Sequence, residues 1–295
     1  MDTFAKSRGD RLFDFLNYCL FSVILLVVLY PLYFIIIASF SDPNAISEGE
    51  VWLIPQHITF EGYQRIMNDP TIWSGYTNSI LYTLVGTGVN IVLTLPAAYA
   101  LSRSDLVGRK IVLGLILFTM FFSGGLIPSY LLVKSLGLLN TIWALVLPNG
   151  VVVYYLIIAR TFFQVSIPDT LLEAAQMDGC SNTRFFAQVV FPLSLPIIAV
   201  MVLFHAVMHW NSYFAAMIYI KDKNMLPLQL ILRDILISSQ QGAIVGDVED
   251  MVMRQRVAEL VKYGVVIVGS LPVLILYPFL QKYFVKGIMI GAIKG

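Results

Sequence analysis

Residues 173 to 179 read Glu-Ala-Ala-Gln-Met-Asp-Gly, and Phe191 and Pro192 follow a little further along the chain. This segment is polar and helix-forming, yet it lies between two long apolar runs. The alternation predicts membrane-crossing helices joined by a polar helical segment that stays outside the hydrocarbon layer.

The composition also indicates a membrane protein. Of the 295 residues, 58% are apolar and 13% are charged, which is far too apolar for a water-soluble domain of this size. A helix needs about 20 apolar residues to cross the ~30 Å hydrocarbon layer. Runs of this kind lie near residues 17–40, 77–102, 111–133, 141–162, 195–219 and 263–283. They are continuous rather than alternating, so we predict an all-α membrane protein with six transmembrane helices.

The distribution of charge predicts the orientation. The first run continues to Phe40, which is too long for a signal peptide, so we count it as an uncleaved span. Six spans put both termini on one side, where eleven Lys and Arg residues face seven Asp and Glu residues. The other side carries eight basic and eleven acidic residues. Basic residues favour the cytoplasmic side, so we predict cytoplasmic termini.

Residues 166–192 predict two short helices joined by a glycine turn. The first helix starts at the capping-box pattern of Ser166 and Asp169, or at a similar pattern three to four residues later. Gly179 can adopt the left-handed conformation that ends a helix, and Ser181 can cap the next one.

Two interpretations of this hairpin remain open from spacing alone. In the first, small Ala174 and Ala175 allow another protein to approach, while Glu173 and Asp178 make charge-assisted contacts at the rim. In the second, the helix lies flat on lipid headgroups, although acidic residues are a poor choice beside anionic lipid. The spacing favours docking, but an E-A-A triplet by itself is a weak signal.

The longer pattern resembles the EAA loop of bacterial ABC importer permeases. The matching positions are Ile167-Pro168, Glu173 to Ala175, Asp178 to Ser181, Phe186 and Phe191 to Pro196. Val189, Phe191 and Cys180 are mild departures, and the resemblance covers residues from about 78 to the end. It implies the type I importer permease (MetI-like) fold and docking of the loop on an ATPase. The docking residues would be Glu173, Ala174, Ala175, Met177, Asp178 and Gly179.

The tail from Tyr283 to Gly295 resembles the end of maltose-type sugar permeases. In those proteins one permease of the pair sends its C-terminus between the two ATPase subunits. The resemblance therefore implies ATPase contacts for Lys286, Gly287 and Lys294. Without it, a Gly-rich tail ending in Lys would be interpreted as a frayed terminus.

The sequence lacks the phosphate-binding pattern G-x-x-x-x-G-K-[ST], so we expect no enzyme activity and no cofactor on this chain. The resemblance implies that ATP and Mg bind to two cytoplasmic ATPase subunits. It also implies a second permease subunit, expected to be a different chain, and an external solute-binding protein. The remaining partner is the lipid of a bacterial cytoplasmic membrane, and we expect no nucleic acid.

The fifth apolar run gathers polar and aromatic residues. The candidate substrate pathway consists of His205, His209, Asn211 and Tyr213. Polar groups inside a membrane are functional candidates, and aromatic faces with hydrogen-bonding rims suit sugar rings. His205 and His209 are four apart, a spacing that can hold a metal, but no third ligand is evident and we expect no metal site.

The overall likeness is to carbohydrate permeases, in the branch that handles oligosaccharides of plant or algal polysaccharides. That branch includes uronic-acid polymers such as alginate or pectin, and this expectation rests on the family alone. The predicted outer side does carry cations, namely Lys221, Lys223, Arg233, Arg254 and Arg256. They would suit an acidic sugar or the rim of a binding protein equally well.

Other classes fit less well. An ion-coupled secondary transporter, the alternative, should bury ionisable groups at mid-membrane and often has inverted repeats, neither of which the sequence shows. An intramembrane enzyme needs a catalytic set that the two His residues lack, and a scaffold leaves the loop without a purpose.

We expect three parts of the chain. Residues 1–76 would form the N-terminal segment, first helix and an external loop with a short helix near 60–68. Residues 77–283 would form the importer core with its coupling loop at 166–192, and 284–295 the cytoplasmic tail. An acidic-started amphipathic helix is expected between 247 and 261.

Overall fold

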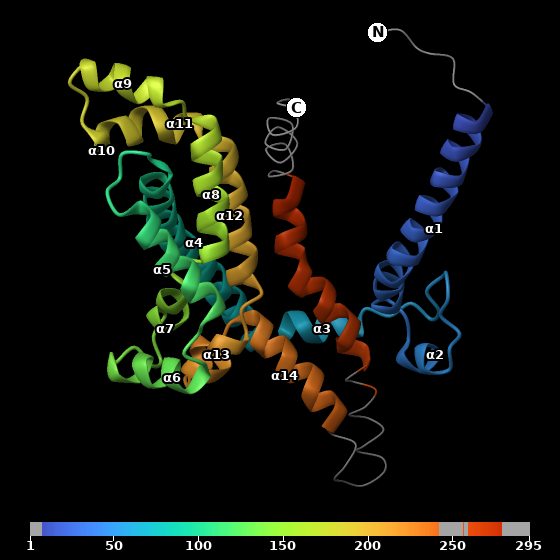
Figure 1. The fold of residues 1–295 in the computed structure, drawn as a ribbon. Helices are drawn as coiled ribbons and strands as arrows, with labels where there is room; N and C mark the ends of the chain where they lie inside the picture. The colour runs from blue at the N-terminus through green and yellow to red at the C-terminus, as the bar shows by residue number, and fades with distance from the viewer. Residues whose placement is uncertain (1–7, 242–255, 257–258, 279–295) are drawn as a thin grey trace. The chain divides into compact units, whose positions relative to one another are not determined.

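The computed structural model describes residues 8–241, 256 and 259–278, and this part of the chain is helical without strands (Figure 1). The all-α prediction is therefore confirmed for the described residues. The chain forms two compact units, one from residues 1–69 and 234–269 and the other from 70–233 and 270–295.

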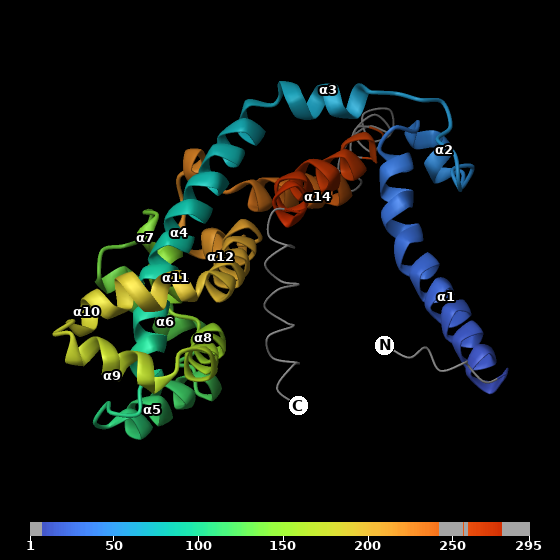
Figure 2. The same cartoon turned by 90° about the horizontal axis from the view of Figure 1, so that it is seen from above.

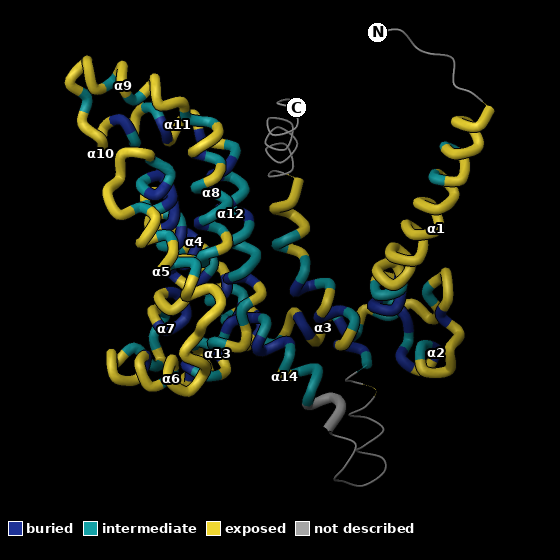
Figure 3. Tube along the Cα trace, in the orientation of Figure 1, coloured by how far each residue is buried: buried dark blue, intermediate teal, exposed yellow. Residues whose placement is uncertain are grey.

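The first unit begins with a long apolar helix. α1 spans Arg8–Ala38, earlier than the expected start at 17, and continues through Pro31. Nearly all of its apolar residues are exposed (Figure 3), which suits contact with lipid tails. Two short helices follow, α2 (Pro43–Ser47) and α3 (Glu61–Asn68). α3 confirms the short helix expected near 60–68.

The helix over Glu259–Pro278 packs closely on α3. A Cβ atom added to Gly62 would meet the backbone of Leu260, so the two helices touch at a glycine. Ser47 Oγ donates to Glu259 Oε2 at 2.7 Å, which adds a polar contact. The amphipathic helix expected between 247 and 261 lies largely outside the described residues.

The second unit begins with α4, a continuous helix of 33 residues over Pro70–Ser102 that includes Pro96. Its remaining helices are α5 (Arg109–Phe121), α6 (Leu126–Ser135), α7 (Trp143–Val146), α8 (Val153–Ser166), α9 (Asp169–Met177), α10 (Asn182–Phe185), α11 (Phe191–Leu193), α12 (Leu195–Trp210) and α13 (Phe214–Tyr219). α14 covers Leu228–Gln241, of which residues 228–233 belong to this unit. Short 3-10 turns cover Leu147–Asn149 and Lys223–Met225. A π-helical turn over Phe186–Val190 joins α10 to α11.

Several expected spans are broken. Residues 111–133 do not form one helix, because α5 and α6 are bent by 113° around Gly125, whose φ of +85° suits glycine. A bend of 52° separates 143–149 from α8, and one of 83° separates 182–193 from α12. Among the described residues, three helices are long and apolar enough to cross a membrane unaided, and up to six spans result if each bent pair counts as one.

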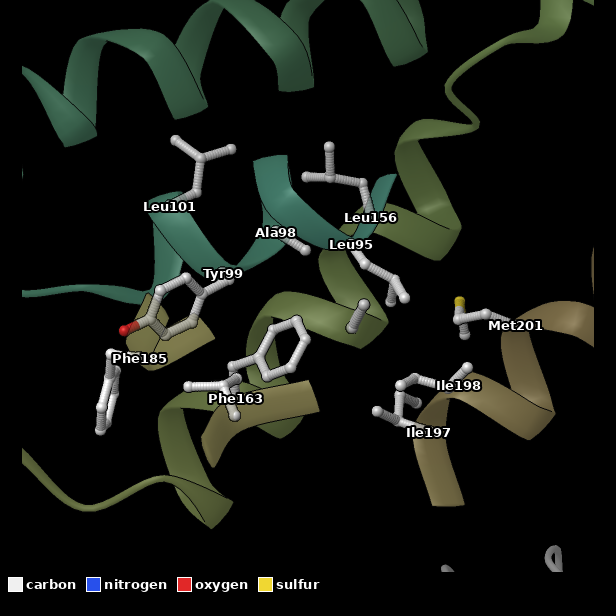
Figure 4. Close-up of a cluster of buried hydrophobic side chains, with 12 residues drawn as sticks. Leu95, Ala98, Tyr99, Leu101, Leu156, Phe163, Phe185, Ile197, Ile198 and Met201 are labelled. Carbon is white, nitrogen blue, oxygen red and sulfur yellow. The ribbon is translucent and has the colours of Figure 1, made fainter. Parts of the chain in front are cut away.

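The core of the second unit lies among α4, α8 and α12. Its buried side chains are Leu95, Ala98, Tyr99, Leu101, Leu156, Ala159, Phe163, Phe185, Val190, Ile197, Ile198 and Met201 (Figure 4). Figures 1 and 2 both show α9, α10 and α11 together at one end of these helices. The predicted polar hairpin is thus an arm laid against the end of a helical bundle.

Candidate functional site

The arm starts one residue after a proline. α9 begins at Asp169, and Pro168 occupies the cap position without a side-chain hydrogen bond. Ser166 still belongs to α8, so the expected capping box at Ser166 is wrong. The helix starts here because the residue before proline and the proline itself favour extended backbone.

The glycine turn follows the prediction. Gly179 has φ of +73°, which is left-handed. The Cys180 N–H donates to the Ala175 carbonyl at 2.9 Å and the Gly179 N–H to the Gln176 carbonyl at 3.0 Å, a Schellman motif. Ser181 Oγ accepts from the Arg184 N–H at 3.4 Å, so the predicted cap of the next helix is confirmed.

α9 has an inner and an outer face. Leu172, Ala175 and Cys180 are half-buried against the core of the unit. Glu173, Ala174, Asp178 and Gly179 are exposed, and 89% of Met177 is exposed. Of the six expected docking residues, five are thus accessible and Ala175 faces the bundle. Their docking role stays a prediction.

The two histidines of α12 lie inside the bundle. His205 is fully buried, with its ring edge-on to Tyr155 at 5.0 Å between centroids. Neither of its nitrogens has a hydrogen-bond partner among the residues that the structure describes. His209 Nε2 lies 2.6 Å from Asn90 Oδ1. Because that oxygen only accepts, the His209 nitrogen carries the proton.

Asn90 joins three elements. Its Nδ2 donates to the carbonyls of Asn149 at 2.6 Å and Gly150 at 2.9 Å, in the break between α7 and α8. The ring of His209 lies against Gly86, one turn earlier on α4, where a Cβ atom would come within 2.5 Å of the ring. Both the nitrogen and the oxygen of the Asn90 amide therefore have hydrogen-bond partners.

The other two candidates of the substrate pathway are exposed, whereas the histidines are buried. Asn211 is exposed and donates to the Val207 carbonyl at 2.9 Å. Tyr213 is 41% exposed, and the Arg233 guanidinium lies 5.7 Å from the centre of its ring. The structure thus separates a buried pair from a surface group, and the pathway itself stays a prediction. The expected tail contacts, Lys286, Gly287 and Lys294, lie outside the described residues.

Sequence reasoning missed Asn90 and Gly86. Asn90 is an amide within an apolar run, and such a residue is a functional or structural candidate wherever it occurs in a span. That signal was present, but its partner His209 is 119 residues away and could not be read from the chain.

Comparison with known proteins agrees with this architecture. Residues 70–290 match the family model described as "Binding-protein-dependent transport system inner membrane component". The polygalacturonan/rhamnogalacturonan transport system permease protein YtcP of Bacillus subtilis (strain 168) is 41% identical over 97% of this chain and 99% of its own. Protein LplC of the same organism is 39% identical over 99% and 98%.

A solved structure is also similar. It is a crystal structure of a bacterial ABC transporter involved in the import of the acidic polysaccharide alginate, with a TM-score of 0.85 and 33% identity. The match covers 96% of this chain and all of that one. The resemblance to importer permeases and the expected fold are confirmed by these matches. The chain belongs to the family of binding-protein-dependent transport system inner membrane components.

Proposed function

We propose that this chain is one permease subunit of an ATP-driven importer of acidic oligosaccharides, and that α9 docks on a cytoplasmic ATPase. ATP and Mg bind to the ATPase subunits, and an external solute-binding protein delivers the sugar. A second permease subunit completes the pathway. Both termini and the arm lie on the cytoplasmic side of a bacterial cytoplasmic membrane, as the charge distribution favours.

The exposed end of α9 carries the docking proposal. Met177 exposes 89% of its surface beside the acidic residues Glu173 and Asp178. A flexible apolar side chain with a charged rim suits a protein surface, since methionine adapts to irregular pockets and charges act at the rim. The inward contacts of Leu172 and Ala175 hold this face outward.

Co-purification tests the docking. The importer would be expressed with all its subunits, solubilised in detergent and captured through this chain, carrying either Met177→Asp or Met67→Asp. Met67 is a second exposed methionine, on α3, and serves as the matched control. We expect the ATPase to be lost with Met177→Asp and kept with Met67→Asp. Retention of the ATPase by both variants would refute docking through α9.

Two relatives and one contact in the structure support the proposal of an acidic substrate. Two relatives transport carboxylated polymers by name, polygalacturonan/rhamnogalacturonan and alginate. In this chain Arg233 lies over the Tyr213 ring. Asn211, two residues before Tyr213, is also exposed. A ring for stacking beside a guanidinium is the combination that a uronate needs, because arginine binds carboxylates in a two-pronged manner.

Uptake into proteoliposomes tests the substrate class. Oligogalacturonate and alginate oligomers would be compared with neutral malto-oligomers, for the wild type, Arg233→Gln and Tyr213→Phe. Tyr213→Phe is the control because it keeps a ring beneath the guanidinium. We expect uptake of acidic oligomers that falls with Arg233→Gln and persists with Tyr213→Phe. Equal uptake of neutral oligomers by the wild type would contradict an acidic specificity.

A further inference from the structure

We infer that Arg103, just beyond the end of α4, is a positioning residue that couples the α9–α11 arm to α4. Through it α4 carries displacement of the arm to residues 224–228 at the other end of the helix. This inference rests on the proposed docking of α9, because only a docked arm receives a push.

Arg103 contacts both the segment that follows α4 and the arm. Its Nε donates to Asp105 Oδ1 at 2.8 Å and its Nη2 to Asp105 Oδ2 at 2.5 Å. Its Nη1 donates to Asn182 Oδ1, at the start of α10, at 2.8 Å. Only 12% of the Arg103 side chain is exposed. The two-pronged bond to Asp105 fixes the plane of the guanidinium, so its third bond is directed at the arm.

Tyr99 adds an apolar contact one turn before Arg103. Its ring lies 5.8 Å from Phe163 of α8 and 5.2 Å from Phe186 of the arm. Two cavities, of about 280 Å³ and about 550 Å³, are both lined by Tyr99 and Arg103. Tyr99 and Arg103 therefore each contact the arm beside a gap in the packing.

The end of α4 is tied to its neighbours. Arg160 Nε of α8 donates to the Leu101 carbonyl at 3.0 Å. Arg109 Nη1 of α5 donates to the carbonyls of Ser102 at 3.3 Å and Arg103 at 3.0 Å. These bonds satisfy carbonyls that a helix end leaves without partners. A force on Arg103 therefore moves α4 together with α5 and α8.

The N-terminal part of α4 holds residues 224–228, which run from the surface at Asn224 to the buried Leu228. Asn78 Nδ2 donates to the carbonyls of Asn224 at 2.7 Å and Leu226 at 3.1 Å. Tyr82 OH donates to the Met225 carbonyl at 2.8 Å, and the Leu228 N–H donates to Ser79 Oγ at 2.8 Å. Asn78 and Ser102 belong to one continuous helix and are separated along it by about 36 Å at 1.5 Å per residue, so a single element joins the arm to this segment.

The test separates coupling from assembly. The complete importer would be reconstituted in liposomes with its binding protein, and both ATP hydrolysis and oligosaccharide uptake measured. Arg103→Lys keeps the charge and loses the fork, Asn182→Ala removes the arm's acceptor, and Asn182→Asp keeps an acceptor. Arg65→Lys is the control, since Arg65 pairs with Glu61 at 2.8 Å within α3.

We expect each of Arg103→Lys and Asn182→Ala to co-purify with the ATPase and to raise the ATP hydrolysed per oligosaccharide by about tenfold, equivalent to ~1.4 kcal/mol of coupling. The double variant should match the single ones, and Asn182→Asp and Arg65→Lys should keep the wild-type ratio. An unchanged ratio in Arg103→Lys, or loss of the ATPase from it, would overturn the inference. Retention of the ATPase by Met177→Asp would instead refute the docking proposal, whatever Arg103 does.

Discussion

Gly86→Ala should destabilise the second unit, because the His209 ring occupies the space where a Cβ atom would lie. The added atom would be 2.5 Å from Cε1 and Nε2 of the ring and 2.7 Å from Cδ2. Ordinary contacts begin at 3.4 Å, so the ring must move by roughly an ångström. Asn90 cannot follow, since its amide is held by two carbonyls.

The expected size follows from these contacts. Crowding of a packed core costs about 1–3 kcal/mol. Breaking the Asn90–His209 hydrogen bond leaves buried polar groups unpaired, at about 1–3 kcal/mol. The helix gains about 1 kcal/mol when alanine replaces glycine. The free energy of unfolding should therefore fall by about 1–5 kcal/mol.

The chain offers a matched control on the same helix. Nothing lies within 4 Å of a Cβ atom added to Gly88, so Gly88→Ala should raise the stability by about 0.5–1 kcal/mol. Unfolding in mixed detergent micelles, followed by tryptophan fluorescence, would give both values. In a His209→Ala background, Gly86→Ala should behave like Gly88→Ala. Equal stability of the two alanine variants, or a penalty that persists without the ring, would refute the reasoning.

Three further outcomes are expected. Gly179→Ala should cost about 1–2 kcal/mol of unfolding free energy, from its positive φ alone, while Gly179→Asn costs less. Asn90→Leu should cost about 2–4 kcal/mol in the same micelle assay, because the Asn149 carbonyl loses its donor; a neutral result would contradict the network. The bond from Arg103 lowers the pKa of Asp105, so this pair stabilises the protein at neutral pH and the stability is lost as the pH falls through that lowered pKa. Asp105→Asn should remove that part of the pH dependence, measured as the unfolding midpoint between about pH 5 and pH 2.

Local chemistry made the arm predictable. Gly179 and Ser181 act within a few residues of themselves, and both behave as their residue types predict. The start of α9 was less predictable because proline and a capping pattern compete at neighbouring positions, and proline decides the outcome. The apolar run at 111–133 predicts length but not direction, so its sharp bend could not be read from hydropathy.

The candidate pathway shows the limit of helical spacing. The spacing of His205 and His209 predicts that they lie near one face of a helix, as they do in the structure. It does not predict which residues of other helices they contact. Tyr155 and Asn90 come from α8 and α4, far away in sequence. Arg103 shows the same limit. It is one of the eleven basic residues on the predicted cytoplasmic side, but its bond to Asn182 depends on the folded arm and could not be predicted from the sequence.

The length of α4 links the protein to the thickness of its bilayer. A helix of about 50 Å exceeds a hydrocarbon layer of ~30 Å, and this mismatch is met by tilting or by ends that emerge into the headgroups. A thicker bilayer brings such a helix upright, and a thinner one tilts it further. Asn78 lies in the N-terminal part of this helix and Arg103 just beyond its C-terminal end. A change in acyl-chain length that alters the tilt of α4 would therefore move both of these contact sites together.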